Sequence, residues 1–367
     1  MWYIDKRIQV ICDELNRLIT VKTIPFDSIS YKEGLFFYPD QADKEGGAWK
    51  DFYPKTMKWY GPDRYYWFRT DYTVPQEMDG KALRLHVKTQ IDEWDDAKNP
   101  QFLLFVNGEV TQGLDMNHRI VQMTDAAKAG DSWRFDMQSY TGILYSEFDM
   151  IFEMQQVDLR VEKLYYDLIV PLRAFTRMKK DDKVRMDIET VLNNAINMLD
   201  LRTPYSEDFY KSIDAAEEYL EKALYQDMTG YDDVIATCIG HTHIDVAWWW
   251  TVSQTREKVA RSFATVLKLM DEYPQYRFMS SQPQLYQFLK ERYPEVYDRI
   301  KARIKEGRWE PEGGMWLEAD TNLTSGESLV RQFFYGKKFF REEFGVDSKI
   351  LWLPDVFGYS GALPQIM

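Results

Sequence analysis

The sequence is poor in cysteine, with only Cys12 and Cys238 among its 367 residues. The two cysteines lie far apart in the chain, which excludes a small fold held together by disulfides. So little cysteine is typical of proteins from reducing compartments, where thiols stay reduced. We therefore expect a cytoplasmic location.

Long apolar runs and basic clusters are also missing. No stretch of 18 apolar residues is present, so the sequence predicts no membrane-spanning helix. The N-terminus carries charges at Asp5, Lys6 and Arg7 and lacks the apolar centre of a secretory signal. The net charge is −13 without a Lys/Arg-rich run, whereas phosphate binding requires a basic surface. We expect neither a membrane nor a nucleic-acid partner.

Aromatic residues, in contrast, are abundant. They make up 16% of the chain, with 12 Trp and 24 Tyr. Pyranose rings stack on indole faces, so this richness suits a protein that handles sugars, although a large aromatic core explains it equally well. The length and the 45% hydrophobic content suffice for two or three domains with buried cores.

Three patterns organise the first part of the chain. Apolar residues at spacings of three and four predict a helix over Asp5–Val21. A strand-rich region follows up to Met178, in which Leu83, Leu85 and Val87 alternate with polar residues. A strand over Phe102–Val106 is followed by Asn107-Gly108, a strong hairpin signal. Several short strands of this kind favour a β-sandwich.

The pattern then becomes helical to Gln226, with a linker over Asp227–Asp233, and changes again afterwards. The apolar run Val234–Ile239 predicts a strand buried on both faces. Further strands alternate with helices, which favours a parallel sheet covered by helices. These strands are predicted at Tyr276–Ser280, near Trp309 and at Ile350–Leu353, and the helices include Gln254–Asp271 and Leu329–Phe344.

The fold class is therefore a multidomain chain with an N-terminal β-sandwich, a helical linker and an α/β domain that contains a parallel sheet. We place an N-terminal helix in residues 1–25, the β-sandwich accessory domain in 26–178, a helical connector in 179–230 and the α/β domain in 231–367.

The strongest chemical feature is the segment GHTHIDVAW, directly after the first predicted strand of the α/β domain. Ligands bind beyond the carboxyl ends of strands in open parallel sheets. In an extended segment, the side chains of every second residue point to the same face, so His241, His243 and Asp245 can face one pocket. Imidazole and carboxylate are ordinary ligands of Zn²⁺. A pair of structural, hydrogen-bonded histidines is the alternative for a bare HxH.

Two further segments follow strands at the same predicted edge. In WLPDVFGYS, Asp355 can bind a metal, attack an anomeric carbon or do both. Taken alone, it is better explained as an N-cap or turn residue, and the shared edge with His243 and Asp245 favours the chemical role. In GGMWLEAD, Glu318 and Asp320 suit a hydroxyl-rich ligand, with a solvated loop charge as the alternative. Trp248 can form a wall of the pocket, whereas we expect Trp249 and Trp250 to pack in the core.

The motifs HTHIDVAW, GGMWLEAD and WLPDVFGYSGALPQIM, in this order and spacing, resemble the α-mannosidases of glycoside hydrolase family 38, in particular the cytosolic or vacuolar type and its bacterial relatives. The similarity runs from about Gly240 to Met367. It implies a metal-dependent retaining α-mannosidase that hydrolyses terminal α-mannosides of glycans or oligosaccharides.

The resemblance also implies roles for particular residues. The metal ligands fall on His243 and Asp245, and the nucleophile, which also binds the metal, falls on Asp355. The aromatic sugar platform falls on Trp248. His241 matches a position that is not a direct ligand, and we expect it to orient a ligand or a carboxylate. Zn²⁺ is the expected metal, while Co²⁺ and Mn²⁺ also suit this ligand set.

In the family, the general acid and a further metal-binding His lie beyond the WLPDVFG motif, whereas this chain stops at Met367. We therefore expect an incomplete catalytic domain with little or no mannosidase activity by itself. Two other functions stay open: a metal-dependent deacetylase or amidohydrolase, which activates a metal-bound water, and a non-catalytic carbohydrate-binding protein. The expected partner is a mannose-containing oligosaccharide, and a homo-oligomer of the full-length protein stays open.

Overall fold

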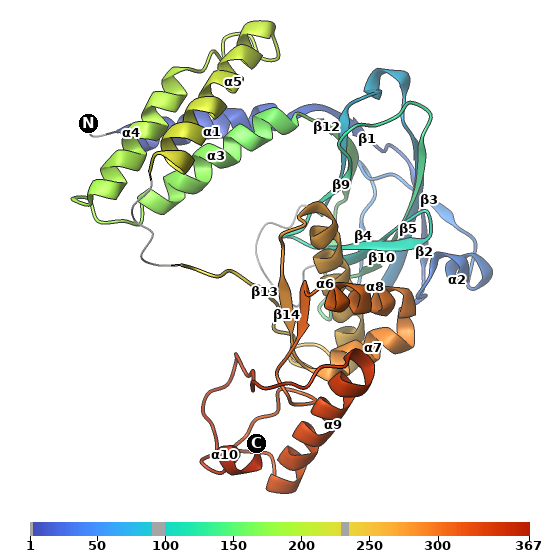
Figure 1. The fold of residues 1–367 in the computed structure, drawn as a ribbon. Helices are drawn as coiled ribbons and strands as arrows, with labels where there is room; N and C mark the ends of the chain where they lie inside the picture. Colours follow the sequence, from blue (N-terminus) through green and yellow to red (C-terminus); the bar gives the residue numbers. More distant parts are fainter. Residues whose placement is uncertain (1–2, 90–99, 229–234) are drawn as a thin grey trace.

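The computed structural model describes residues 3–89, 100–228 and 235–367. Three groups of elements are visible in Figure 1: a helical bundle that includes α1, a pair of β-sheets, and an α/β part that ends in α9 and α10. None of the helices in the described ranges is both long enough and apolar enough to cross a bilayer.

Four helices form the bundle: α1 (Ile4–Ile19), α3 (Leu159–Phe175), α4 (Lys183–Asn197) and α5 (Glu207–Leu220). Their buried faces share one core, which includes Ile8, Leu15, Leu164, Leu168, Ile213 and Leu220. Asp158 begins α3, because its carboxylate accepts hydrogen bonds from the backbone N–H groups of Arg160 and Val161. The short elements η2 (Glu221–Gln226) and α2 (Pro39–Lys44) are also helical.

The bundle corrects two predictions. The helix predicted over Asp5–Val21 ends at Ile19, and β1 (Thr20–Pro25) follows it, because this β-branched segment pairs antiparallel with β12. The predicted strand-rich region extends to Met178, but Leu159–Phe175 is a helix, since its apolar face packs against the other bundle helices. Most of the predicted linker, with the boundary between residues 230 and 231, lies outside the described residues.

Two antiparallel sheets face each other across a second core. One has the strand order β1-β12-β6-β9, and the other the order β3-β2-β5-β10-β7-β8. The bounds are β2 Ile29–Glu33, β3 Lys50–Phe52, β5 Tyr65–Thr73, β6 Ala82–Lys88, β7 Gln101–Val106, β8 Glu109–Leu114, β9 Ile120–Thr124, β10 Ser132–Tyr140 and β12 Ile151–Val157. The short β4 (Trp59–Tyr60) pairs with β11 (Glu147–Phe148), and η1 (Gln76–Met78) is a single turn.

The predicted hairpin at Asn107-Gly108 is confirmed. Strands β7 and β8 pair antiparallel around this turn, with Val106 opposite Glu109. Asn107 and Gly108 have φ values of 52° and 87°, the left-handed conformation that a two-residue hairpin turn requires.

The α/β part contains a parallel sheet in the order β13-β14-β15, formed by Gly240–His241, Phe278–Ser280 and Trp309–Pro311. The helices around it are α6 (Val252–Glu272), α7 (Pro283–Arg292), α8 (Pro294–Lys305), α9 (Gly326–Phe344) and α10 (Leu363–Ile366). Gly313 extends the parallel pairing by a single bridge to Leu351.

Two predicted strands of this sheet differ from the structure. Residues 235–239, within the predicted strand Val234–Ile239, are not in a strand, and Ile235 is 91% exposed. The reason is that β13 lies at the edge of the described sheet, so only β14 pairs with it. The predicted strand Ile350–Leu353 is reduced to the bridge at Leu351. Val234 itself lies outside the described residues.

Helix α6 joins the α/β part to the six-stranded sheet. The Thr265 Oγ1 accepts a hydrogen bond from the Gly113 N–H (3.1 Å) and lies 3.2 Å from the Gly113 carbonyl oxygen. A Cβ on Gly113 would lie 2.6 Å from the carbonyl oxygen of Arg261, so only glycine permits this approach. The sheet therefore packs directly on the helix that follows the HTHID segment.

Candidate metal centre

The HTHID segment begins with His241 at the end of the edge strand β13, and two contacts fix its path beyond the strand. The Gln282 side-chain amide donates a hydrogen bond to the Ile244 carbonyl oxygen (3.0 Å). The indole N–H of Trp250 donates to the carbonyl oxygen of Asp245 (3.2 Å), just before α6 begins behind its cap Thr251. The segment therefore leaves the sheet as an anchored loop that presents His243 and Asp245.

The Asp355 loop reaches the same place from the far end of the sequence. It follows the bridge between Gly313 and Leu351, and buried Leu353 anchors it in a small core with Met315 and Leu329. The Tyr359 hydroxyl donates a hydrogen bond to the Leu353 carbonyl oxygen (3.1 Å), which closes the loop around Asp355.

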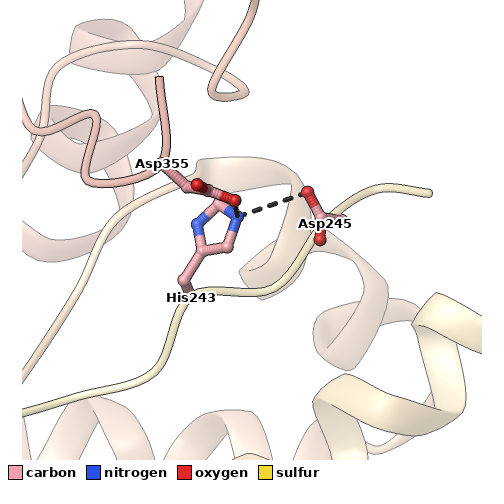
Figure 2. A group of neighbouring side chains, drawn as sticks. All are labelled: His243, Asp245 and Asp355. Atoms are coloured by element: carbon pink, nitrogen blue, oxygen red, sulfur yellow. Dashed lines mark hydrogen bonds and ion pairs between the residues drawn. The ribbon is translucent and has the colours of Figure 1, made fainter. Parts of the chain in front are cut away.

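Three side chains from these two loops converge (Figure 2). The Nε2 of His243 lies 3.3 Å from the Asp245 Oδ1 and 3.6 Å from the Asp355 Oδ2. One ligand atom from each residue lies within 4.8 Å of the others. The structure thus brings together the three residues that the sequence predicts as metal ligands, while their roles stay predictions.

Negative charge surrounds this histidine. Its Nδ1 lies 2.9 Å from the Oε2 of Glu318, a close ion pair that is not a straight hydrogen bond. The contact with Glu318 raises the pKa of His243 to about 9, against a lowering by partial burial, and Asp245 adds to the increase. Three carboxylates around one imidazole favour a cation at this point, because a cation offsets their mutual repulsion.

The donor set fits a divalent metal. One imidazole nitrogen and two carboxylate oxygens are suitable ligands for Zn²⁺, and also for Co²⁺ or Mn²⁺. The Asp355 side chain is 53% exposed and that of Asp245 is 35% exposed, so the site is open to solvent.

His241 does not join the three. Its Nδ1 lies 3.0 Å from the Met279 carbonyl oxygen, and its Nε2 accepts a hydrogen bond from the Trp352 indole N–H (3.2 Å). It therefore ties β13 to the middle strand and to the segment that leads to Asp355.

The remaining predicted site residues are more scattered. Trp248 is 56% exposed and stacks edge-on with Trp249 and Trp250, and Trp249 is itself 63% exposed rather than packed in the core as expected. Asp320 accepts hydrogen bonds from the N–H groups of Asn322 and Leu323 (2.8 and 3.0 Å), so it holds a turn of its own loop. Within the described part of the chain, Asp320 forms neither a hydrogen bond nor an ion pair with His243.

Two polar residues of the site were not predicted. Ser281 and Gln282 follow β14 and are 4% exposed each. The Ser281 hydroxyl donates to the Oε1 of Glu318 (2.8 Å), and Gln282 adopts a left-handed φ of 61° just before Pro283. The signal was present in the sequence, since a polar pair directly after a buried strand lies at the ligand-binding edge.

A family profile and the curated relatives both point to the same family. The profile described as the glycosyl hydrolases family 38 N-terminal domain matches residues 233–367. Alpha-mannosidase G from Dictyostelium discoideum is 31% identical, over 95% of this chain and 32% of that protein. Human alpha-mannosidase 2C1 is 30% identical, over 90% of this chain and 32% of that protein. This chain therefore spans about a third of the length of these relatives.

Another relative matches this chain over a shorter stretch and with higher identity. An alpha-mannosidase from Saccharomyces cerevisiae is 47% identical over 129 residues, which cover 35% of this chain and 12% of the yeast protein. Among solved structures, a β-glucuronidase from Faecalibacterium prausnitzii matches 37% of this chain and 32% of its own, with 9% identity and a TM-score of 0.25. A structural likeness of that size carries no argument about function.

Proposed function

Because this chain belongs to glycoside hydrolase family 38, we propose that it carries part of the active site of a metal-dependent, retaining α-mannosidase. The proposed substrates are terminal α-mannosides of glycans or oligosaccharides. The observation that carries the proposal is the convergence of His243 and Asp245 with Asp355, which lies 110 residues further along the chain than Asp245.

The proposed ligands are His243, Asp245 and Asp355, and a bound divalent ion supplies Lewis-acid attraction for the hydroxyl groups of mannose. The carboxylate of Asp355 attacks the anomeric carbon, a glycosyl ester forms, and the bond from that carbon to the leaving oxygen breaks. A separate carboxylic acid protonates the leaving oxygen, and water later hydrolyses the ester with retention. We assign this acid to none of the described residues.

Two further assignments support substrate handling. Trp248 offers an exposed indole face three residues after Asp245, suited to stacking on a sugar ring. Asp320 lies in the loop next to the site and is the proposed contact for a sugar hydroxyl. The two cysteines are free, Cys12 buried and Cys238 exposed, which supports a proposed location in a reducing, cytoplasmic compartment.

Covalent trapping tests the nucleophile. A fluorinated mannosyl fluoride should add one fluoromannosyl group to the chain, and peptide mass spectrometry should place it on Asp355. Fluoride leaves without help from a general acid, so the experiment isolates the nucleophile from the acid that we do not assign. Asp355→Asn should abolish the label, because an amide is a poor nucleophile.

Glu310→Gln is the matched control, since Glu310 is an exposed carboxylate on the same sheet, in β15. It should keep the label. A label on a residue other than Asp355 would overturn the assignment. Release of acetate from an acetylated sugar without any label would instead favour the deacetylase, which activates a water and forms no glycosyl ester.

A further inference from the structure

Glu318 is a buried carboxylate that uses both of its oxygens inside the protein. Its side chain is 6% exposed, although it lies next to the open site. The Oε2 lies 2.9 Å from the Nδ1 of His243, and the Oε1 accepts a hydrogen bond of 2.8 Å from the Ser281 hydroxyl. A side chain engaged in this way is poorly placed to contact a sugar, which is the role predicted for it from the sequence.

The position of Glu318 decides which nitrogen of His243 is available. The two ring nitrogens face different neighbours: Nδ1 faces Glu318, and Nε2 faces Asp245 and Asp355. An imidazole that binds a metal through one nitrogen carries a proton on the other. With Glu318 paired at Nδ1, the proton would stay on that nitrogen when a metal binds, and the lone pair of Nε2 would be available to an ion between the two aspartates.

Glu318 is itself held from the middle strand of the sheet. Gln282 donates from its amide to the Ile244 carbonyl oxygen (3.0 Å), and its amide oxygen accepts from the Glu318 N–H (3.4 Å). The Ser281 hydroxyl fixes the carboxylate. The loops that follow β13, β14 and β15 are thereby fastened together next to His243, in the order of the strands in the sheet.

We propose that Glu318 is a positioning residue, which orients His243 and fixes its tautomer for metal binding, and that Ser281 sets the orientation of Glu318. This inference rests on the proposed function, because it takes His243 as a metal ligand. The carboxylate acts through the histidine, raises the basicity of Nε2 and does not touch the substrate.

The test is the affinity of the chain for Zn²⁺ alone, measured by isothermal titration calorimetry. Glu318→Gln should weaken binding about 10- to 100-fold, the usual effect of losing such a partner. Glutamine has one acceptor oxygen where glutamate uses two, so it cannot serve both Ser281 and His243. Ser281→Ala should weaken binding less, and the double variant should bind no worse than Glu318→Gln, because both act through one contact.

A spectroscopic signature separates positioning from general support of the fold. In zinc-loaded, ¹⁵N-histidine-labelled protein, the Nδ1–H proton of His243 should give a resolved NMR signal, and Glu318→Gln should broaden it through faster exchange with water. Glu310→Gln should leave both the affinity and the signal unchanged. Circular dichroism melting identifies any variant that has lost its fold, and Ser281→Ala is the milder variant for that case.

The outcomes distinguish the two proposals. If the unaltered chain binds no Zn²⁺, both the metal site and the role of Glu318 are overturned. If it binds Zn²⁺ and folded Glu318→Gln binds equally well with an unchanged Nδ1–H signal, only the role of Glu318 is overturned.

Discussion

At the scale of single residues, Glu257 is a carboxylate in an almost fully buried position on α6. Its exposure is 2%, and its Oε1 lies 3.8 Å from the Nη1 of Arg292. Burial raises the pKa of Glu257 to about 7, although Arg261 and Arg292 oppose the rise. Between pH 4.5 and pH 7, the folded protein therefore keeps a proton that the unfolded chain has lost.

This shift predicts how stability depends on pH. The contribution of Glu257 to the free energy of unfolding is fully present below about pH 4.5 and is lost as the pH rises through 7. Relative to Glu257→Gln, which cannot titrate, the free energy of unfolding of the unaltered protein should fall by on the order of 2 kcal/mol between pH 5 and pH 8. Denaturant unfolding at several pH values measures this difference.

Glu291→Gln is the control for this prediction. The hydrogen bond from Gln287 and the pairing with Arg256 lower the pKa of Glu291, so its carboxylate is ionised in both states across the same range. The difference in the free energy of unfolding between Glu291→Gln and the unaltered protein should stay constant with pH. If the free energy of unfolding of Glu257→Gln also differed from that of the unaltered protein by a constant amount, the buried carboxylate would already be ionised at pH 5.

The histidines show how far sequence reasoning reaches at this scale. Alternation along an extended chain placed His243 and Asp245 together, and the structure brings them within 3.3 Å. The same alternation predicted that His241 points in that direction too. His241 instead lies in β13 itself, where the Met279 carbonyl oxygen and Trp352 engage both of its nitrogens. Those partners come from β14 and from the segment after Leu351, which are distant in the sequence, so local spacing alone could not reveal them.

At the scale of elements, strands buried on both faces were predicted well where two layers cover them. In β7, Phe102 and Leu104 face the core between the two sheets, while Leu103 and Phe105 face the core shared with α6. This double burial explains the continuous apolar run in the sequence. The run Val234–Ile239 looks the same in sequence, yet its described residues are exposed, because they precede the edge strand β13 and lie outside the described sheet.

The prediction was wrong for helix α3, where packing outweighs local preferences. Its sequence contains Tyr165, Tyr166 and Val170, which favour strands locally, and Pro171 inside the helix. Packing of Leu164, Leu168 and the rest of its apolar face on the other bundle helices outweighs those preferences. That packing depends on helices distant in the sequence, so local propensity could not predict it.

The contact between β8 and α6 is an element-scale feature that a single atom can disrupt. In Gly113→Ala, the added Cβ would lie 2.6 Å from the Arg261 carbonyl oxygen, so the helix must move or the strand must bend. We expect a loss of about 1–3 kcal/mol in the free energy of unfolding, which is typical of overpacking. Chemical denaturation measures it.

Gly47→Ala is the matched control, because a Cβ there meets nothing within 4 Å. It should change stability by less than about 0.5 kcal/mol. Equal stability of the Gly113 and Gly47 variants would show that the sheet and α6 are further apart in solution than in the structure.

At the scale of the whole molecule, the six-stranded sheet and the α/β part share one hydrophobic core. Trp67, Leu103, Phe105 and Val110 from the sheet pack with Phe263, Leu267, Tyr286 and Trp309 from the α/β part. The helical bundle has a separate core, to which the described residues of the sheets contribute Ala82 and Val157. We therefore expect the sheet and α6 to open together, and the bundle to open independently.

Two neighbouring residues of β7 test this coupling. Phe105→Ala removes a fully buried ring from the core shared with α6, at a cost of about 3–5 kcal/mol, and should speed amide hydrogen exchange in α6 as well as in β7. Leu104 is also fully buried, but Leu104→Ala leaves a cavity in the core between the two sheets. It should therefore speed amide hydrogen exchange mainly in β6 and β12. In both variants, exchange in α3, α4 and α5 should stay at its original rate. If Phe105→Ala left exchange in α6 unchanged, the sandwich would be an independent module, and the loop that carries His243 would gain no support from it.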